Sequence, residues 1–217
     1  MDIYIIDKTD SVINKYLAEM RDVNIQKDRM RFRRNIERIG ELMAYEVSKN
    51  MAYAPTTVTT PLGNAIVNMP VDRVVVGTIL RAGLPMHTGV LNVFDDAENC
   101  FASAYRAYND KHEVEIHLGY AATPDLEGKT LILADPMLAT GFSMLQVIEQ
   151  LMKYGRPAHI HILSIIGARP GVEYLRDNLK GVDATLWCAT VDPVLNADSY
   201  IVPGLGDAGD LAFGEKN

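Results

Sequence analysis

The sequence predicts an α/β protein built on an open, mostly parallel and twisted sheet flanked by helices. From residue 74 onward, short runs rich in β-branched residues alternate with amphipathic runs of helical length. In the second half single helices separate the strands, and strands connected in this way run parallel through right-handed crossovers. With 217 residues, 48% of them apolar, the chain is expected to form a single domain over residues 1–217.

An amphipathic helix is predicted within a helical N-terminal region at residues 1–50. Its apolar residues recur every three or four positions, which places them on one stripe that docks on a core. These residues are Phe32, Ile36, Ile39, Met43 and Val47. Arginines at positions 31, 34 and 38 lie away from the stripe. They form a basic flank, which is either a solvated face or an anion-binding surface.

The middle of the chain predicts a buried strand, a helix and an antiparallel hairpin arm. The strand covers residues 74–80 and the helix residues 83–94. The hairpin consists of strands at 100–108 and 113–118, joined through Asn109-Asp110, because both residue types are favoured in turns.

Residues 130–191 predict a regular βαβαβ unit. Strands are expected at 130–134, 159–166 and 185–191. Helices are expected at 144–154 and 172–179, and they end before Gly155 and near Gly181, respectively. Open parallel sheets bind ligands beyond the carboxyl ends of their strands. We therefore expect the functional site at that edge of the sheet.

Composition excludes several classes of function. A net charge of −7 argues against broad attraction to nucleic acid. No stretch predicts a secretion signal or a membrane span. The two cysteines, Cys100 and Cys188, have no second ligand at metal-binding spacing, which suits free thiols in a reducing cytoplasm. His159 and His161 share one face of a strand, but no third ligand lies nearby, so no metal site is expected.

A candidate phosphate-binding loop follows the strand at 130–134 and precedes a helix. Its residues are Asp135, Pro136, Met137, Leu138, Ala139, Thr140, Gly141, Phe142 and Ser143. At such a junction, backbone N–H groups, hydroxyls and the helix N-terminus can all point at a phosphate. Asp135 supplies an acceptor for ribose hydroxyls. The alternative is an ordinary strand-to-helix loop with a polar cap.

Two arginines and a glycine-rich segment are further candidates. Arg81 directly follows the strand at 74–80 and Arg106 lies in the strand at 100–108, so both can fork onto a diphosphate or form surface ion pairs. The glycines at 204, 206 and 209 allow the backbone to approach a flat base edge-on. The alternative for this segment is a flexible tail.

Four segments together resemble the uracil phosphoribosyltransferase family, in the family's order. They are the stretch from Ile79 to Leu84, Tyr105-Arg106, the loop from Asp135 to Ser143, and the segment from Tyr200 to Asp210. The N-terminal helix followed by Tyr45-Glu46 is also similar, so the resemblance covers nearly the whole chain. The C-terminal segment is the most specific of them.

The resemblance implies a phosphoribosyltransferase-like fold with a base-binding hood at residues 192–217. It implies transfer of phosphoribose from phosphoribosyl diphosphate (PRPP) to uracil, giving UMP and diphosphate, with Mg²⁺ carried by PRPP and no protein metal site. The catalytic residues would be Arg81, Asp135 and Asp207. PRPP would contact these three, Arg106 and the loop from Pro136 to Ser143. Uracil would contact Tyr200, Ile201, Gly206, Asp207 and Ala208.

The resemblance leaves regulation and assembly open. The family forms homodimers or homotetramers, and GTP activates some members. A nucleotide- or PRPP-sensing regulatory protein on the same fold, with little turnover, is the alternative function, and transfer to another oxo-base is a third.

The chain departs from the family's pattern at three positions. They are Phe142 in place of a glycine, Leu211 in place of a basic residue and Glu215 in place of a threonine. Phe142 fits the loop if its side chain points outward, since only a position with positive φ requires glycine.

Overall fold

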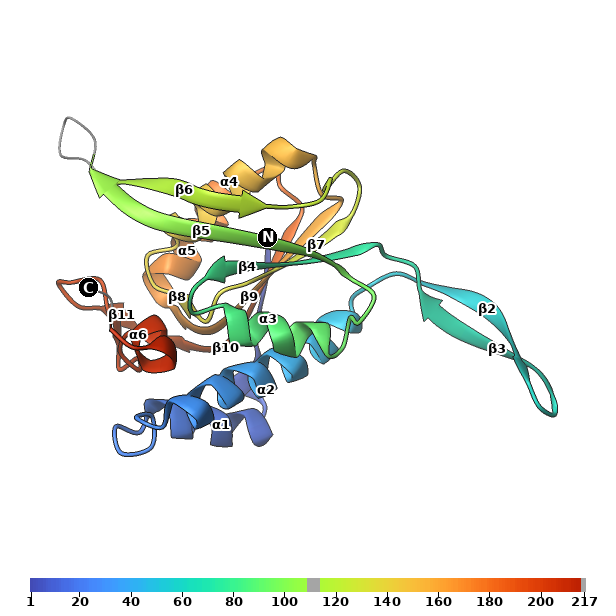
Figure 1. Cartoon of the computed structure of the whole chain (residues 1–217), viewed down its shortest axis with the longest axis horizontal. Coiled ribbons are helices and arrows are strands. Elements are labelled where there is room, and N and C mark those ends of the chain that lie inside the picture. The colour runs from blue at the N-terminus through green and yellow to red at the C-terminus, as the bar shows by residue number, and fades with distance from the viewer. Residues whose placement is uncertain (109–113, 216–217) are drawn as a thin grey trace.

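The structure is a computed structural model that describes residues 1–108 and 114–215, without the side chains of residues 104–119. Within these residues, the centre of the molecule is a sheet with strand order β1-β10-β9-β7-β4-β5-β6, and a short β8 also pairs with β9 (Figure 1). Every neighbouring pair is parallel except β5 and β6. The strands are β1 (Asp2–Ile5), β4 (Val74–Leu80), β5 (Glu98–Tyr108), β6 (Val114–Ala122), β7 (Thr130–Ala134), β8 (Met137–Leu138), β9 (His159–Ala168) and β10 (Ala184–Asp192).

Helices cover both faces of the sheet (Figure 1). Helices α1 (Val12–Arg21), α2 (Arg29–Ser48) and α3 (Leu84–Leu91) pack on one face, and α4 (Phe142–Leu151) and α5 (Arg169–Asn178) on the other. Short 3₁₀ turns, η1 (Ile6–Lys8) and η2 (Met152–Tyr154), follow β1 and α4. The predicted apolar stripe of α2 is confirmed, because its five residues are at most 1% exposed.

The central strands feed two separate cores. Val76 and Ile132 belong to the cluster beneath α2, whereas Val75, Leu131 and Leu133 belong to the cluster beneath α4. Successive side chains of a strand point to opposite faces, so a strand covered on both sides needs apolar residues throughout. This is why residues 74–80 and 130–134 carry continuous apolar runs.

The predicted parallel unit is confirmed, with boundaries that agree to within three residues. The predicted hairpin is β5 and β6, which form one edge of the main sheet; its turn, Asn109-Asp110, lies outside the described residues. The N-terminal region differs from the prediction at residues 2–5, which form the edge strand β1 instead of helix. Helix α1 lies within the predicted helical region, although its bounds were not predicted, and Ser11 caps it through a hydrogen bond from Ile13 N.

Two further features complete the molecule. A second hairpin, β2 (Tyr53–Thr60) and β3 (Gly63–Pro70), projects from the body as an arm, which the sequence analysis did not predict (Figure 1). The hood contains β11 (Val194–Leu195), β12 (Ile201–Val202) and α6 (Ala208–Phe213). Among the described helices, none is long and apolar enough to cross a membrane.

Candidate active site

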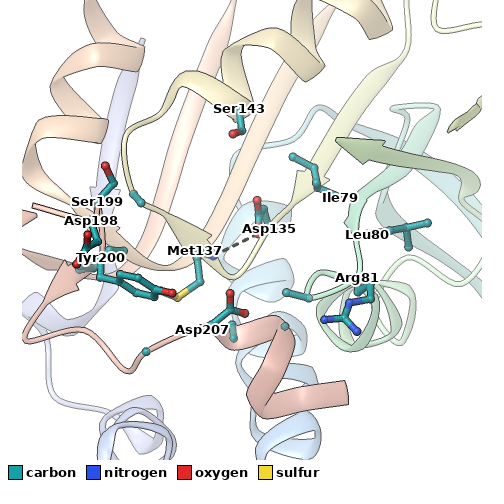
Figure 2. A pocket seen from close by; sticks show the side chains of 16 residues that line it. Ile79, Leu80, Arg81, Asp135, Met137, Ser143, Asp198, Ser199, Tyr200 and Asp207 are labelled. Atoms are coloured by element: carbon teal, nitrogen blue, oxygen red, sulfur yellow. Dashed lines mark hydrogen bonds between the residues drawn. The ribbon is translucent and has the colours of Figure 1, made fainter. Parts of the chain in front are cut away.

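A pocket of about 530 Å³ opens at the carboxyl ends of β4 and β7, beneath the hood (Figure 2). Its lining comes from three parts of the chain. These residues are Ile79, Leu80, Arg81 and Ala82 at the end of β4 and just beyond it; Asp135, Met137, Ala139 and Ser143 after β7; and Asp198, Ser199, Tyr200, Ile201, Gly206, Asp207, Ala208 and Gly209 in the hood. The pocket therefore lies where an open parallel sheet places its ligands.

The loop after β7 turns sharply into α4. Gly141 precedes the helix with φ of +79°, and a Cβ there would lie 2.6 Å from the carbonyl oxygen of Gly171. Both the positive φ and this close approach require glycine. The turn brings the first turn of a ten-residue helix, with Ser143, to the pocket. A helix N-terminus presents unpaired N–H groups and partial positive charge, which suits an anion.

The predicted loop residues divide into two groups. Asp135, Met137, Ala139 and Ser143 line the pocket. The others, Pro136, Leu138, Thr140, Gly141 and Phe142, belong to the same loop but do not line the pocket. Leu138 is buried in the core beneath α4, and the Thr140 hydroxyl accepts a hydrogen bond from Phe142 N at 3.3 Å. These residues therefore support the loop on the side away from the pocket.

Phe142 points away from the pocket. Its ring lies 6.3 Å from the ring of Tyr174 on α5, centroid to centroid, at an angle of 55°. Its φ is not positive, unlike that of Gly141. The backbone at position 142 therefore does not require glycine, which explains how this loop accommodates a large side chain there.

Asp135 lies at the floor of the pocket and is partly enclosed. Desolvation raises the pKa of its carboxyl to about 7, and a hydrogen bond from Met137 N at 3.3 Å opposes this shift. A carboxylate in such surroundings favours a ligand that brings hydrogen-bond donors or a cation.

Arg81 faces the pocket from the end of β4 (Figure 2). Part of its guanidinium is hydrogen-bonded to residues of the hood. Its Nη2 donates to Asp210 Oδ1 at 3.2 Å and to the carbonyl oxygen of Gly214 at 3.3 Å, while its buried Nε has no hydrogen-bond partner among the described residues. Arg106 is in β5 opposite Ile116, but its side chain lies outside the described part of the structure.

The hood contributes small residues to the pocket lining as well as the polar side chains of Asp198, Ser199, Tyr200 and Asp207 (Figure 2). Asp207 caps α6, accepting from Asp210 N at 2.9 Å, and its neighbours Gly206 and Ala208 also line the cavity. Leu211, where the resemblance leads us to expect a basic residue, packs against the core beneath α2. The hood side therefore offers peptide groups and carboxylates.

Two lining residues escaped the sequence analysis, namely Asp198 and Ser199. They occupy a turn in which Asn196 Oδ1 accepts from Asp198 N at 3.0 Å and from Tyr200 N at 2.8 Å. Ser199 has φ of +65°. The sequence Asn-Ala-Asp-Ser is a turn signal that could have been recognised, but only the fold brings this turn beside β7.

The remaining candidates lie elsewhere. His159 and His161 share a face as expected, and His161 accepts a hydrogen bond from Trp187 Nε1 at 3.2 Å. Desolvation lowers the pKa of His161 to about 4, so it is a neutral core residue. The described residues contain no group of three or more potential metal ligands. In the predicted basic flank, Arg31 and Arg34 pair with Glu19 and Glu37.

Comparison with known proteins decides the family. The family model described as uracil phosphoribosyltransferase matches residues 8–215. A uracil phosphoribosyltransferase of Porphyromonas gingivalis is 54% identical over 216 residues, covering 100% of both chains. The chain belongs to the uracil phosphoribosyltransferase family. One from Thermococcus gammatolerans is 38% identical and covers 93% of this chain and 89% of its own.

A solved structure confirms the fold. A protein from Aquifex aeolicus superimposes with a TM-score of 0.85 at 28% identity, covering 98% of each chain. The phosphoribosyltransferase-like fold expected from the resemblance is thus confirmed. In this uracil phosphoribosyltransferase family member, segments that lie far apart in the sequence converge on the one pocket described above.

Proposed function

We propose that the protein transfers the 5-phosphoribosyl group of PRPP to uracil, giving UMP and diphosphate. The observation that carries this proposal is the convergence of three kinds of group on one cavity. A helix N-terminus, an arginine and a carboxylate lie at strand ends, opposite a loop that presents backbone groups. The names of the matched family and relatives support the same activity.

The loop after β7 is proposed to hold the 5′-phosphate and ribose of PRPP. The segment from Ala139 to Ser143 is assigned to the phosphate, which would lie against Ala139, Ser143 and the α4 N-terminus, while Thr140, Gly141 and Phe142 shape the loop. Asp135 accepts hydrogen bonds from the ribose hydroxyls, and these donors compensate the carboxylate for its desolvation. Pro136, Met137 and Leu138 connect the two parts of this loop.

The diphosphate is assigned to Arg81 and Arg106. Arg81 has a spare Nε donor, and its contacts with Asp210 and Gly214 can be exchanged for phosphate oxygens. Charge on the departing diphosphate and on an oxocarbenium-like ribose is stabilised electrostatically, with inversion at C1, so no protein nucleophile is needed.

Uracil is assigned to the hood, at Tyr200, Ile201, Gly206, Asp207 and Ala208. The base presents an acceptor, a donor and an acceptor at O4, N3 and O2. Peptide N–H and C=O groups of the hood can match this pattern, with Asp207 between base and PRPP.

Mg²⁺ is proposed to arrive with PRPP. The pocket contains the carboxyl groups of Asp135, Asp198 and Asp207, and among the side chains that the structure describes Arg81 is the one cation in its lining. Oxygen donors suit Mg²⁺, which usually retains waters and substrate phosphates in its shell. When bound, the ion would neutralise diphosphate charge, and the carboxylates of Asp135 and Asp207 would lie near it.

The experiment is a diphosphate-release assay from PRPP with a panel of free bases, run with Mg²⁺ and with a chelator, and with and without GTP. Turnover with uracil supports the proposal. Tight binding of PRPP or UMP without turnover would instead establish the regulatory protein. Acceleration by GTP would show the effector that the resemblance implies.

Replacing Phe142 by Gly is expected to leave the KM for PRPP within about threefold of wild type, a change below roughly 0.7 kcal/mol. The reason is that the ring packs on Tyr174 and does not line the pocket. Steady-state kinetics of the two proteins decide the matter. A tenfold decrease in this KM would show that Phe142 obstructs the phosphate loop.

We also propose a homodimer or homotetramer whose subunits pack through the arm. Within the described part of the chain, strands β2 and β3 pair only with each other, and an isolated two-stranded hairpin is marginally stable in water. One face of the arm carries Val58, Val67 and Met69, all exposed. A second copy of the chain is the occupant that would bury these side chains.

The arm prediction is tested by Val67→Glu, which is expected to shift the protein to monomer in light scattering after size exclusion. A buried charge without a partner opposes association. The control is Asn68→Glu, which places the same charge on the opposite face of β3. A monomeric wild type, or equal effects of the two variants, would contradict the proposal.

A cytoplasmic location is proposed as well. Both cysteines are buried and free, and burial raises the pKa of the Cys188 thiol to about 12. Such thiols persist in a reducing compartment.

A further inference from the structure

An arginine outside the pocket holds the hood in place. Arg21, the last residue of α1, reaches Asp192, the last residue of β10, through two parallel bonds: Nη1 to Oδ2 and Nη2 to Oδ1, each 2.8 Å. A guanidinium that engages both carboxylate oxygens is fixed in direction as well as distance. Asp192 is only 5% exposed, so its carboxylate is shielded from water, whereas the Arg21 side chain is partly exposed.

The same pair forms hydrogen bonds with both the carbonyl oxygen and the N–H group of Gly204. Arg21 Nη1 donates to the Gly204 carbonyl at 2.9 Å, and Gly204 N donates to Asp192 Oδ2 at 2.8 Å. Gly204 has φ of +56°, and a Cβ there would lie 2.1 Å from the Ile201 carbonyl oxygen. The hood backbone is thus anchored at its tightest point, between the pocket residues Ile201 and Gly206.

A second, weaker contact from the same region supports the next residue. Gln26 Nε2 donates to the carbonyl oxygens of Met20 at 2.9 Å and Leu205 at 3.2 Å. Leu205 is itself buried in the core beneath α2. Hydrogen bonds therefore connect two consecutive hood residues, 204 and 205, to the end of α1 and the segment after it. These two residues immediately precede Gly206, which lines the pocket.

We propose that Arg21 and Asp192 are positioning residues that set the hood's affinity and selectivity for the base. This inference rests on the proposed function, in which hood peptide groups recognise uracil. Neither residue lines the pocket, so they act through Gly204. Hydrogen bonds to a planar base depend on sub-ångström placement of the backbone, and a misplacement of about 1 Å can cost 10²-fold in rate.

The effect is expected to fall mainly on the base, because Asp207 is the one hood residue that is also assigned to PRPP. Arg81, Asp135 and Ser143 lie at the ends of β4 and β7 and on α4, and none of them contacts the pair among the described hydrogen bonds. Loss of the pair therefore loosens the hood and leaves the PRPP side of the pocket in place. If the pair had a purely structural role, its loss would lower thermal stability without affecting the base more than PRPP.

The test is Arg21→Gln, compared with wild type for both substrates and for cytosine. We expect the KM for uracil to increase at least about tenfold, the KM for PRPP to stay within about threefold, and the preference for uracil over cytosine to decrease at least about tenfold. Arg21→Lys keeps the charge but loses the fork, so it is expected to recover only part of the affinity.

Matched controls keep the result interpretable. Arg31→Gln removes an ion pair between α2 and α1, with Glu19, and is expected to leave all three quantities unchanged because Arg31 is exposed and donates to no hood residue among the described hydrogen bonds. Gln26→Ala removes the amide contacts with Met20 and Leu205 and tests the inference if Arg21→Gln does not fold. It should shift the uracil KM in the same direction, about two- to fivefold.

Two outcomes would overturn the inference. One is an unchanged uracil KM and base preference in folded Arg21→Gln and Gln26→Ala. The other is an equal increase of the KM for uracil and for PRPP, which would indicate general loosening. A wild-type protein that uses PRPP but does not prefer uracil over cytosine would instead overturn the assignment of the hood as the uracil site, before any variant is compared.

Discussion

Replacing Asp135 by Asn is expected to lower kcat/KM for PRPP at least about tenfold, on the order of 1.4 kcal/mol of transition-state stabilisation. Asn keeps the size of the side chain and the acceptor for Met137 N. It loses the negative charge that is proposed to accept ribose hydroxyls and to balance the oxocarbenium-like ribose. The result would place Asp135 at the reacting centre.

The same substitution is expected to stabilise the folded protein at alkaline pH. In the folded state the pKa of Asp135 is about 7, against an ordinary value of 3.8. Between these two values the folded protein holds a proton that the unfolded chain has lost, so stability decreases as pH increases through this window. At pH 8 the buried charge is fully present, and Asn removes a penalty on the order of 1 to 4 kcal/mol.

The measurement pairs steady-state kinetics with thermal unfolding at pH 4 and pH 8. A gain of 1 kcal/mol corresponds to about 2 to 4 °C for a chain of this size, and we expect the gain at pH 8 only. The control is Asp177→Asn, because Asp177 is exposed at the surface and should change neither quantity. Unchanged kcat/KM in folded Asp135→Asn would remove this residue from the site.

Uracil is expected to be preferred over cytosine by roughly 10²-fold or more in kcat/KM. The hood backbone that accepts from N3–H and donates to O4 would face an acceptor at N3 and a donor at the exocyclic amine of cytosine. Each buried mismatch costs about 1 to 3 kcal/mol. Two mismatches together give the expected discrimination.

Orotate is expected to fail for an electrostatic reason. Its carboxylate would enter a pocket whose hood side carries Asp198 and Asp207, while the lining cation, Arg81, is assigned to the diphosphate. Burying such a charge without a partner is strongly unfavourable. Values of kcat/KM for uracil, cytosine and orotate decide the matter, with adenine as a control for base size. Comparable use of cytosine or orotate would contradict the assignment of the hood.

The sequence was sufficient to predict those strands and helices whose formation depends on residues close together in the chain. The strands at 74–80 and 130–134 carry continuous apolar runs because both faces are covered, and their predicted boundaries match β4 and β7. The stripe on α2 was equally clear. The arm, by contrast, is largely exposed, and its apolar residues at 65, 66, 67 and 69 do not alternate, so it offered no strong periodicity.

Prediction of the site followed the same division. The loop from Asp135 to Ser143 was predicted because strand, glycine, hydroxyl residues and helix follow one another directly in the chain. Asp198 and Ser199 were missed because their turn becomes part of the site only when the fold places it opposite the ends of the strands. Arg81 was predicted, but its contacts with Asp210 and Gly214 were not.

By itself the sequence determined the βαβαβ core, the position of the phosphate loop and the family, because hydrophobic period and short motifs depend on neighbours along the chain. Only the tertiary structure decided where Phe142 points, how Asp135 is desolvated and what holds the hood. Arg21 and Asp192 are separated by 171 positions, and no local pattern marks them as partners. Their contact exists because the folded sheet brings the end of α1 to the end of β10, and burial there makes the pair specific.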